Sequence, residues 1–167
     1  LKKITDVPID VHLMVNHPED IIPMCIDAGA DIISFHPETA NNKIFRLLNQ
    51  IKDAGRRCGV VLNPATPAEA IKEYAHLLDK VTVMSVDPGY AGQKFIPESL
   101  NKIKQLIAMR EAHGYHYLTE IDGSCNEKTF NVISQSGVDI FIVGTSGLFS
   151  LADNVSDAWD KMVDIYQ

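Results

Sequence analysis

The sequence lacks the features that mark secreted, membrane-embedded and nucleic-acid-binding proteins. It has only three cysteines in 167 residues, and Cys25, Cys58 and Cys125 show neither paired metal-site spacing nor a disulfide framework. We therefore expect a reducing, cytoplasmic location. No apolar run approaches the length of a membrane span, so we expect no membrane association. The net charge of −7 disfavours nucleic acid as a partner, because binding its phosphate backbone needs a basic face.

Linkers, low-complexity segments and runs of charge are also missing from the sequence. Hydrophobic residues make up 46% and charged residues 22%, which is typical of a globular domain. We therefore expect residues 1–167 to belong to a single domain.

Short apolar runs alternate with stretches of helical periodicity along the whole chain. Six such runs each end in a polar or glycine-containing turn, and they read IDVHLMV, DIISFHPE, GVVLNPATP, VTVMSVDPGYAGQ, TEIDGSCN and DIFIVGTSG. Strict alternation of strand and helix predicts a parallel sheet covered by helices. The economical α/β architecture is a (β/α)8 TIM barrel, whose active site lies at the C-terminal ends of the strands.

The pattern predicts strands at 9–14, 31–36, 58–63, 80–86, 117–122 and 139–143. It predicts helices at 18–29, 42–54, 67–77, 99–113, 127–136 and 155–166. A barrel of this kind has eight strand–helix units and about 250 residues. We therefore expect this chain to carry the last six units, with two N-terminal units missing.

Alternation along the strands predicts which side chains enter the barrel. In IDVHLMV the apolar alternate residues face the helices, which turns Asp10, His12 and Met14 inward. In TEIDGS the same rule turns Glu120 and Asp122 inward. Charged and imidazole groups inside a barrel are costly unless they are paired or bind a metal.

His12 and Asp122 are open to two interpretations. Both could be isolated, hydrogen-bonded polar residues of the core. Both could instead bind one divalent metal ion, since imidazole and carboxylate suit zinc, manganese, iron or cobalt. Two ligands are too few for a complete site, so further ligands would have to come from the missing strands.

The ends of the last two expected strands have a common pattern of glycine and hydroxyl residues. The residues are Gly123, Ser124, Gly144, Thr145 and Ser146. Phosphate commonly binds in barrels after the last two strands, at backbone N–H groups. The alternative is that the glycines only form turns.

The longest loop follows the fourth expected strand and contains Gly89, Tyr90, Ala91 and Gly92. It could fold over the site as a lid. An ordinary surface loop explains the spacing equally well.

Four further residues could line the site. Met14 and Met84 should point into the upper barrel, although simple core filling explains them as well. His36 can face inward but suits an ordinary packed or hydrogen-bonded role, and Asn63 suits fixing the turn that follows it. Cys125 has no adjacent base that would mark it as a nucleophile.

At these residues the chain resembles the ribulose-phosphate 3-epimerase family over its whole length. The segments that carry the resemblance are DVHLMV, GADIISFHPE, GVVLNPATP, VMSVDPGYAGQKFIPESLNKI, EIDGSCN and GVDIFIVGTSGLF. Within the family, HPET, DGSCN and GTSGLF are more similar to the D-allulose-6-phosphate 3-epimerases.

The resemblance implies a metal-dependent inversion at C3 of a ketose phosphate through an enediolate. It implies that Asp122 is one acid/base and a metal ligand, and that His12 is a metal ligand that also contacts substrate. It assigns substrate or phosphate contacts to residues 89–92, 123–124 and 144–146, and a sulfur-lined cap to Met14 and Met84. We also expect a homo-oligomer.

The chain departs from the family pattern in one respect. The family's first strand supplies a serine that contacts substrate, and its second strand supplies a His and an Asp. These two are metal ligands, and the Asp is the second acid/base. None of the three is present in residues 1–167, so we expect no activity from these residues alone.

Two other functions remain open. One is a non-catalytic phosphosugar-binding fragment. The other is a different phosphate-binding barrel, an aldolase or a decarboxylase. A Schiff-base aldolase needs a lysine inside the barrel, and the only lysine near a strand is Lys80 at a strand start, so the sequence argues against this class.

Overall fold

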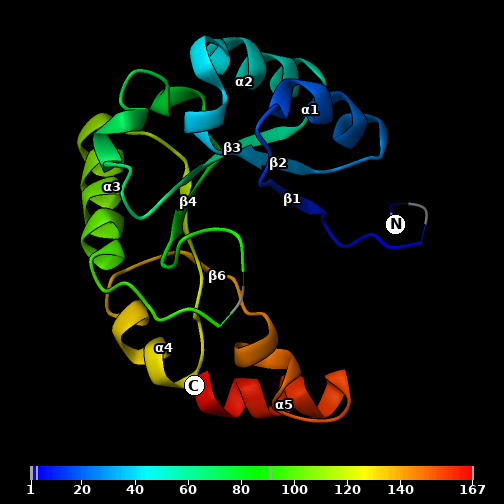
Figure 1. Cartoon of the computed structure of the whole chain (residues 1–167), viewed down its shortest axis with the longest axis vertical. Coiled ribbons are helices and arrows are strands. Elements are labelled where there is room, and N and C mark those ends of the chain that lie inside the picture. The colour runs from blue at the N-terminus through cyan, green and yellow to red at the C-terminus, as the bar shows by residue number, and fades with distance from the viewer. Residues whose placement is uncertain (1, 3, 91, 167) are drawn as a thin grey trace.

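A computed structural model of the chain describes residue 2, residues 4–90 and residues 92–166. These residues contain six parallel strands in one sheet, in the order β1-β2-β3-β4-β5-β6. The strands are β1 Asp10–Leu13, β2 Ile32–Phe35, β3 Arg57–Leu62, β4 Lys80–Met84, β5 Leu118–Asp122 and β6 Ile140–Phe141. The sheet curves into an arc with the helices around its outside (Figure 1). The expectation of a partial (β/α)8 barrel with six strand–helix units is confirmed.

The helices follow the strands in the expected alternation. The α-helices are α1 Pro18–Asp27, α2 Ile44–Asp53, α3 Ser99–His113, α4 Glu127–Ser134 and α5 Val155–Tyr166. Shorter helical segments are η1 Pro37–Thr39, η2 Asn41–Lys43, η3 Ala68–Ile71, η4 Ala75–Leu77 and η5 Thr145–Phe149. Among the described residues, no helix combines the length and the apolar character needed to cross a membrane.

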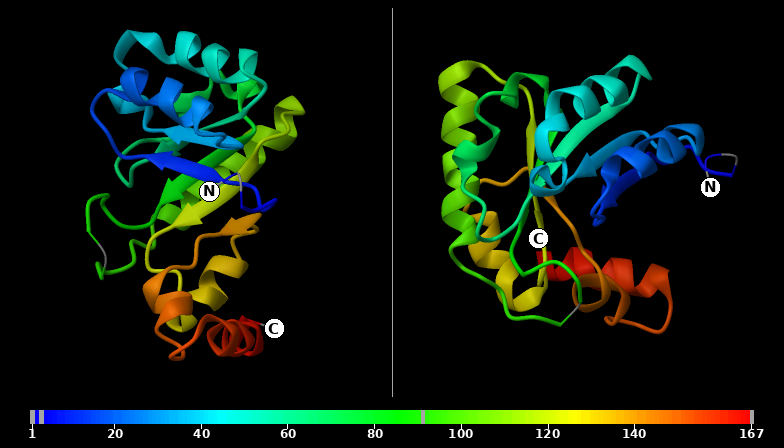
Figure 2. Two further views of the ribbon diagram at one scale, coloured as in Figure 1. Left: turned by 90° about the vertical axis from the view of Figure 1, so that its right-hand side faces the viewer. Right: turned by 45° about the horizontal axis from the view of Figure 1, so that its top comes forward.

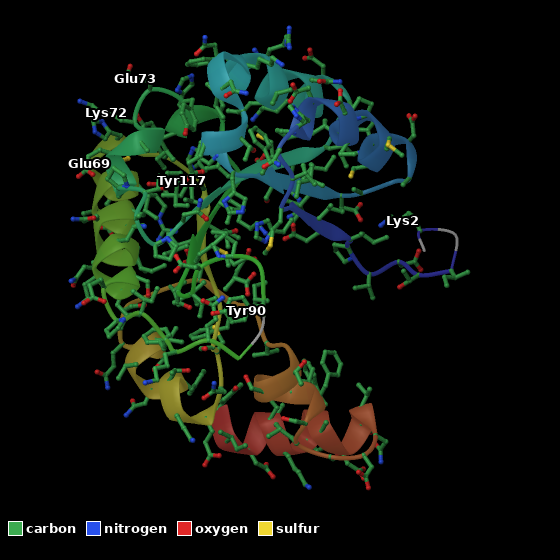
Figure 3. All side chains as sticks on the ribbon, in the orientation of Figure 1. Lys2, Glu69, Lys72, Glu73, Tyr90 and Tyr117 are labelled. Carbon is green, nitrogen blue, oxygen red and sulfur yellow. The ribbon has the colours of Figure 1, made fainter. Side chains whose placement is uncertain are left out.

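The main core fills the space between the strands and the outer helices. Ile33 and Phe35 of β2 pack there with Leu48 of α2, and all three side chains are fully buried. Complete burial of one such side chain stabilises the fold by about 1.5–3 kcal/mol. Tyr117 lies beneath α3, where its hydroxyl donates to the Leu106 carbonyl oxygen at 2.7 Å (Figure 3). These contacts hold the helices against the outer face of the sheet. The sheet and the helices that cover it are seen from two further sides in Figure 2.

A group of three charged side chains occupies the inner face at the N-terminal end of the strands. Lys80 is only 4% exposed, and its ammonium donates to Asp10 and, at 2.7 Å, to Oε1 of Glu120. The Thr82 hydroxyl donates to the same Glu120 oxygen at 2.7 Å. We call Asp10, Lys80 and Glu120 the floor triad. Because β1 and β4 are not neighbours in the sheet, the triad links them across the inside of the arc.

The floor triad corrects the expectation that no lysine lies inside the barrel. Lys80 is the first residue of β4, and strand alternation places its side chain on the inner face with Thr82 and Met84, between two carboxylates. Its side-chain nitrogen is engaged in hydrogen bonds to both carboxylates, so it does not face the cavity as a nucleophile. The expectation that no lysine lies inside the barrel was therefore wrong. The conclusion against a Schiff-base aldolase still holds for Lys80, because both carboxylates engage its side chain.

The expected helix at 67–77 is wrong. The structure has two short 3₁₀ segments, η3 and η4, in its place. Thr66 directly precedes this segment and is a residue type that caps helices, but its hydroxyl donates to Glu38 and makes no cap bond. Lacking that cap, the segment makes only single turns.

The end of the barrel also differs from expectation. The strand expected at 139–143 is reduced to Ile140 and Phe141, although the Ile142 amide still donates to the Ile121 carbonyl oxygen at 3.0 Å. A π-helix that the sequence did not reveal, η5, follows directly. A Cβ at Gly147 would lie 2.2 Å from the Cys125 carbonyl oxygen, so only glycine allows η5 to approach the end of β5 so closely.

Candidate active site

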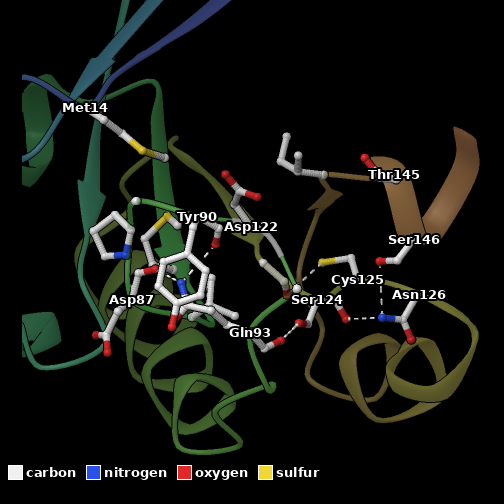
Figure 4. Close-up of a pocket in the computed structure, with 18 residues that line it drawn as sticks. Met14, Asp87, Tyr90, Gln93, Asp122, Ser124, Cys125, Asn126, Thr145 and Ser146 are labelled. Atoms are coloured by element: carbon white, nitrogen blue, oxygen red, sulfur yellow. Dashed lines mark hydrogen bonds between the residues drawn. The ribbon is translucent and has the colours of Figure 1, made fainter.

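A cavity of about 810 Å³ lies at the C-terminal ends of the strands, between Met14 of the β1 end and the ends of β4, β5 and β6 (Figure 4). Most of the residues expected at the site line it. They are Met14, Met84, Gly89, Tyr90, Gly92, Asp122, Gly123, Ser124, Gly144, Thr145 and Ser146. Ala91, which was also expected there, lies outside the described residues. A smaller cavity of about 260 Å³ is lined by His36 and Asn63, and Met14 and Gly89 belong to both.

His12 and Asp122 meet across the inside of the arc. His12 Nδ1 lies 3.7 Å from Asp122 Oδ2, and both side chains are partly buried. The two residues lie on β1 and β5, which are not neighbours in the sheet, so the curvature of the sheet creates the pair. Their inward orientation, expected from strand alternation, is confirmed.

His12 also contacts His36, which directly follows β2. Their Nε2 atoms lie 2.8 Å apart, with a ring-centroid distance of 5.0 Å. His36 is 3% exposed, and burial lowers its pKa; the adjacent His12 ring lowers it further, and Glu38 acts in the opposite direction. His36 is therefore a neutral hydrogen-bonding partner of His12, in agreement with the expected hydrogen-bonded role.

Ser85, which directly follows β4, holds the turn after β5 by hydrogen bonds. This residue was not identified from the sequence. The Ser85 amide donates to the Asp122 carbonyl oxygen at 2.8 Å, and its hydroxyl donates to the carbonyl oxygens of Asp122 and Gly123. Gly123 has φ +117°, and a Cβ there would lie 2.7 Å from Cγ2 of Val86. The close fit of this turn fixes the backbone that carries Asp122.

Gln93 and Asn126 connect the long loop, the β5 turn and η5. The Ser124 hydroxyl donates to the Gln93 carbonyl oxygen at 2.5 Å. The Asn126 amide donates to the Ser124 carbonyl oxygen at 3.1 Å and to the Ser146 hydroxyl at 3.5 Å, while its oxygen caps α4. Sequence reasoning missed both residues, although Asn before the acidic start of a helix is a recognisable cap signal.

The long loop folds against the mouth of the cavity. Tyr90 is 73% exposed on the open side of the arc (Figure 3). The Gln93 side-chain amide donates to the carbonyl oxygens of Asp87 and Tyr90, which braces the loop from within. The loop borders the cavity, and its role as a lid stays a prediction.

Cys125 lines the cavity but does not have the character of a nucleophile. Burial, followed by the charge of Asp122, raises the pKa of its thiol to about 12. The thiol is therefore protonated at neutral pH.

Geometry at His12 and Asp122 fits one shared metal ion. Two ligands that each lie about 2.0–2.2 Å from an ion can be at most about 4.4 Å apart, and the observed 3.7 Å is within that limit. One nitrogen and one oxygen donor suit the expected zinc, manganese, iron or cobalt. Within residues 2, 4–90 and 92–166, no group of three or more His, Cys, Asp or Glu side chains could hold a metal ion.

The arc is similar to larger α/β barrels of known structure. A single-residue variant of the tryptophan synthase α-subunit from Pyrococcus furiosus superposes with a TM-score of 0.67 at 13% identity, covering 99% of this chain and 67% of that one. A 3-hexulose-6-phosphate synthase superposes with a TM-score of 0.62 at 14% identity, covering 87% and 67%. At these identities the similarity concerns the fold alone.

Sequence comparison identifies nearer relatives. Ribulose-phosphate 3-epimerases are 40% identical in Buchnera aphidicola, over 88% of this chain and 64% of the relative, and 41% identical in Aquifex aeolicus, over 92% and 68%. The Bacillus subtilis enzyme is 40% identical over 87% and 67%. The chain thus spans about two thirds of the length of these relatives. The model of the ribulose-phosphate 3 epimerase family matches residues 1–149, and the chain belongs to this family.

Proposed function

We propose that this chain forms the larger part of an epimerase that inverts C3 of a ketose phosphate. The observation that carries the proposal is the His12–Asp122 pair, 3.7 Å apart beside a cavity of about 810 Å³ at the catalytic end of the arc. Family membership supports the same reaction.

Asp122 is the residue to which we assign proton transfer at C3. Its carboxylate lines the cavity, while its backbone is held by Ser85, so it can face a bound sugar without moving the strand. Inversion needs a second acid on the opposite face of the sugar, since a single group returns the proton to the side from which it came. We assign that role to a carboxylate outside residues 1–167, as the family resemblance implies.

His12 and Asp122 would hold a divalent metal ion, with further ligands outside residues 1–167. When bound, the ion supplies positive charge beside the oxygens of the enediolate. The contact with His36 orients the His12 ring. Met84 is 2% exposed and excludes water from the cavity wall.

The metal assignment makes a direct prediction for His12→Ala. We expect affinity for Zn²⁺ to fall about tenfold or more, because one of the two available donors is lost. Metal content after dialysis, measured by elemental analysis, tests this. His116→Ala, which removes a solvent-exposed imidazole, is the control. Full retention of metal by His12→Ala would make His12 a packing residue.

We assign the substrate phosphate to the end of the cavity formed by Gly123, Ser124, Gly144, Thr145 and Ser146. The first N–H groups of η5 have no partner within the helix and can donate to an anion. The Ser146 hydroxyl accepts from the Asn126 amide, which also donates to the Ser124 backbone carbonyl oxygen.

Gly144→Val tests the phosphate assignment. A Cβ at Gly144 meets no atom within 4 Å, so the fold can accept a side chain that projects into open space. We expect the KM to rise about 10–100-fold, which corresponds to the loss of one charge-assisted hydrogen bond, with a smaller change in kcat. An unchanged KM in steady-state assays would place the phosphate elsewhere.

The preferred sugar is the finer part of the proposal. HPET, DGSCN and GTSGLF favour D-allulose 6-phosphate, whereas the relatives are named for ribulose phosphate. We propose D-allulose 6-phosphate first and D-ribulose 5-phosphate second. Comparison of kcat/KM for both sugars in the full-length protein tests the order, and turnover of neither would contradict the epimerase assignment.

A second candidate is a phosphosugar-binding protein without activity. The observation that favours it is that, of the two carboxylates that line the main cavity, Asp122 lies beside His12, whereas Asp87 belongs to the long loop. Sugar-phosphate binding by calorimetry without exchange of the C3 proton into heavy water would identify this function. We also propose a cytoplasmic location, since three cysteines without the spacing of a disulfide framework suit a reducing compartment.

A further inference from the structure

Ser124, at the phosphate end of the main cavity, has an unusual backbone conformation. Its φ is +50°, and Asn41 is the only other non-glycine residue with positive φ among the residues that the structure describes. Asparagine adopts this left-handed region readily, whereas serine does so at a cost in free energy. We propose that Asn126 is a positioning residue that holds Ser124 in this conformation and thereby fixes the phosphate end. The functional part of this proposal rests on the proposed phosphate assignment.

The side chain of Ser124 makes a contact that glycine could not make. Glycine at this position would avoid the cost of the left-handed backbone. The Ser124 hydroxyl, however, donates to the Gln93 carbonyl oxygen at 2.5 Å and so ties the long loop to the β5 turn (Figure 4). A costly conformation of this kind persists only where the surrounding structure holds it in place.

The start of α4 supplies groups that hold Ser124. Its carbonyl oxygen accepts from the Asn126 side-chain amide at 3.1 Å and from the Thr129 hydroxyl at 2.6 Å. Two donors from a helix start determine the direction of this carbonyl group. They therefore fix the peptide plane that follows Ser124.

Helix capping determines which way the Asn126 amide points. Its Oδ1 accepts from the Lys128 backbone N–H at 3.1 Å, so Nδ2 is the atom that faces the Ser124 carbonyl oxygen. Nδ2 also lies 3.5 Å from the Ser146 hydroxyl oxygen on η5. One side chain thus caps α4 with its oxygen and contacts both sides of the phosphate end with its nitrogen.

The position of η5 depends on the same turn. A Cβ at Gly147 would lie 2.2 Å from the Cys125 carbonyl oxygen, so the backbones of η5 and of the β5 turn are in close contact. A shift of the turn would therefore displace η5 together with Thr145 and Ser146. Loss of the Asn126 amide should loosen both sides of the phosphate end.

Asn126→Ser separates the two roles of this side chain. Serine caps helices about as well as asparagine, so α4 should keep its cap while the amide that reaches Ser124 is lost. Asn154→Ser is the matched control. Asn154 accepts from the Asp157 backbone N–H at 2.9 Å, is exposed and lies outside the lining of the main cavity. Circular dichroism should show that both variants remain folded.

The backbone of residue 124 provides the first measurement. In ligand-free, full-length protein, its ¹³C chemical shifts and its three-bond HN–Hα coupling report φ. We expect one left-handed conformation in the wild type and in Asn154→Ser, and exchange with other conformations in Asn126→Ser. A wild-type residue 124 that is not left-handed overturns the proposal, and so does a left-handed conformation that Asn126→Ser leaves unchanged.

Calorimetric titration with inorganic phosphate provides the second measurement. Asn126→Ser should bind phosphate about 3–10-fold more weakly than the wild type, as expected for the loss of one hydrogen bond, and Asn154→Ser should bind it as the wild type does. In a Ser124→Gly background the left-handed conformation has no steric cost. The same Asn126→Ser change should then weaken binding by less than about twofold. Equal effects in the two backgrounds overturn the proposal.

The two measurements separate the positioning role from the proposed function. The spectra need neither ligand nor turnover, so they test the action of Asn126 on Ser124 directly. The expected spectra in a wild-type protein that binds no phosphate would contradict the phosphate assignment but not the hold on Ser124. The expected phosphate affinities without epimerase activity would contradict only the proposed reaction.

Discussion

Asp122→Asn should reduce epimerase activity of the full-length protein by at least about 10³-fold and leave the fold intact. An amide can neither take up nor return the C3 proton, and loss of a general acid–base alone costs about 10²–10⁴-fold. The amide is also a poorer metal ligand than a carboxylate. The fold should survive because Ser85 holds residue 122 through the backbone carbonyl oxygen, which the substitution does not change. Turnover assays measure the loss of activity, and circular dichroism measures whether the fold is retained.

Asp160→Asn is the matched control for this experiment. Asp160 is exposed on α5, so the same chemical change there should leave kcat and KM at wild-type values. Activity of Asp122→Asn within tenfold of the wild type would remove Asp122 from the proton-transfer step. A collapsed circular dichroism spectrum would instead contradict the claim that the residue is held through its backbone.

Lys80→Met should be the most destabilising single substitution in the floor triad. It preserves most of the side-chain volume but leaves Glu120, which is 3% exposed, without its cation. Removing one partner of a buried ion pair costs about 3–5 kcal/mol, because the remaining charge stays buried and unpaired. We expect that loss in the free energy of unfolding, measured by urea titration.

A neutral triple variant separates charge from packing. Combining Lys80→Met with Asp10→Asn and Glu120→Gln removes all three charges, so most of the lost stability should return. Thr82 can still donate to residue 120 in this variant. A loss below about 1 kcal/mol in the single variant, or no recovery in the triple variant, would contradict the electrostatic role of the triad.

Strand alternation predicted which residues face the inside of the arc, because the orientation of a side chain in a strand depends only on its position along that strand. The apolar residues of IDVHLMV identify the buried outer face, so Asp10 and His12 must point inward, and their contacts with Lys80 and Asp122 confirm it. The same rule turns Lys80 inward with Met84, but Lys80 was set aside because it starts a strand. The sequence shows that this residue starts a strand, but it does not show that two carboxylates from other strands lie opposite.

The parts of the site that sequence reasoning missed depend on contacts between distant segments. The Thr66 hydroxyl donates to Glu38 and so does not cap the segment that follows it, although 67–77 was expected to be a helix. Glu38 also lies beside His36, so one tertiary hydrogen bond affects both places. The approach of η5 to Cys125 depends on the missing side chain of Gly147, which sequence reasoning treated as part of a turn. Propensity and spacing contain no information about such partners.

The floor triad also restricts how this sequence can diverge. Asp10 lies two residues before His12 on β1, and Glu120 lies two residues before Asp122 on β5. The same two strands therefore carry both the floor triad and the residues beside the main cavity. Loss of Lys80 alone leaves a buried carboxylate without its cation, so the effects of substitutions at the three positions on stability are coupled. A sequence that replaces the triad one residue at a time is therefore expected to pass through less stable single variants. Among the described residues, none that lines the main cavity shares a side-chain hydrogen bond with the floor triad. Substitutions among the cavity-lining residues are therefore expected to be tolerated more independently than substitutions in the floor triad.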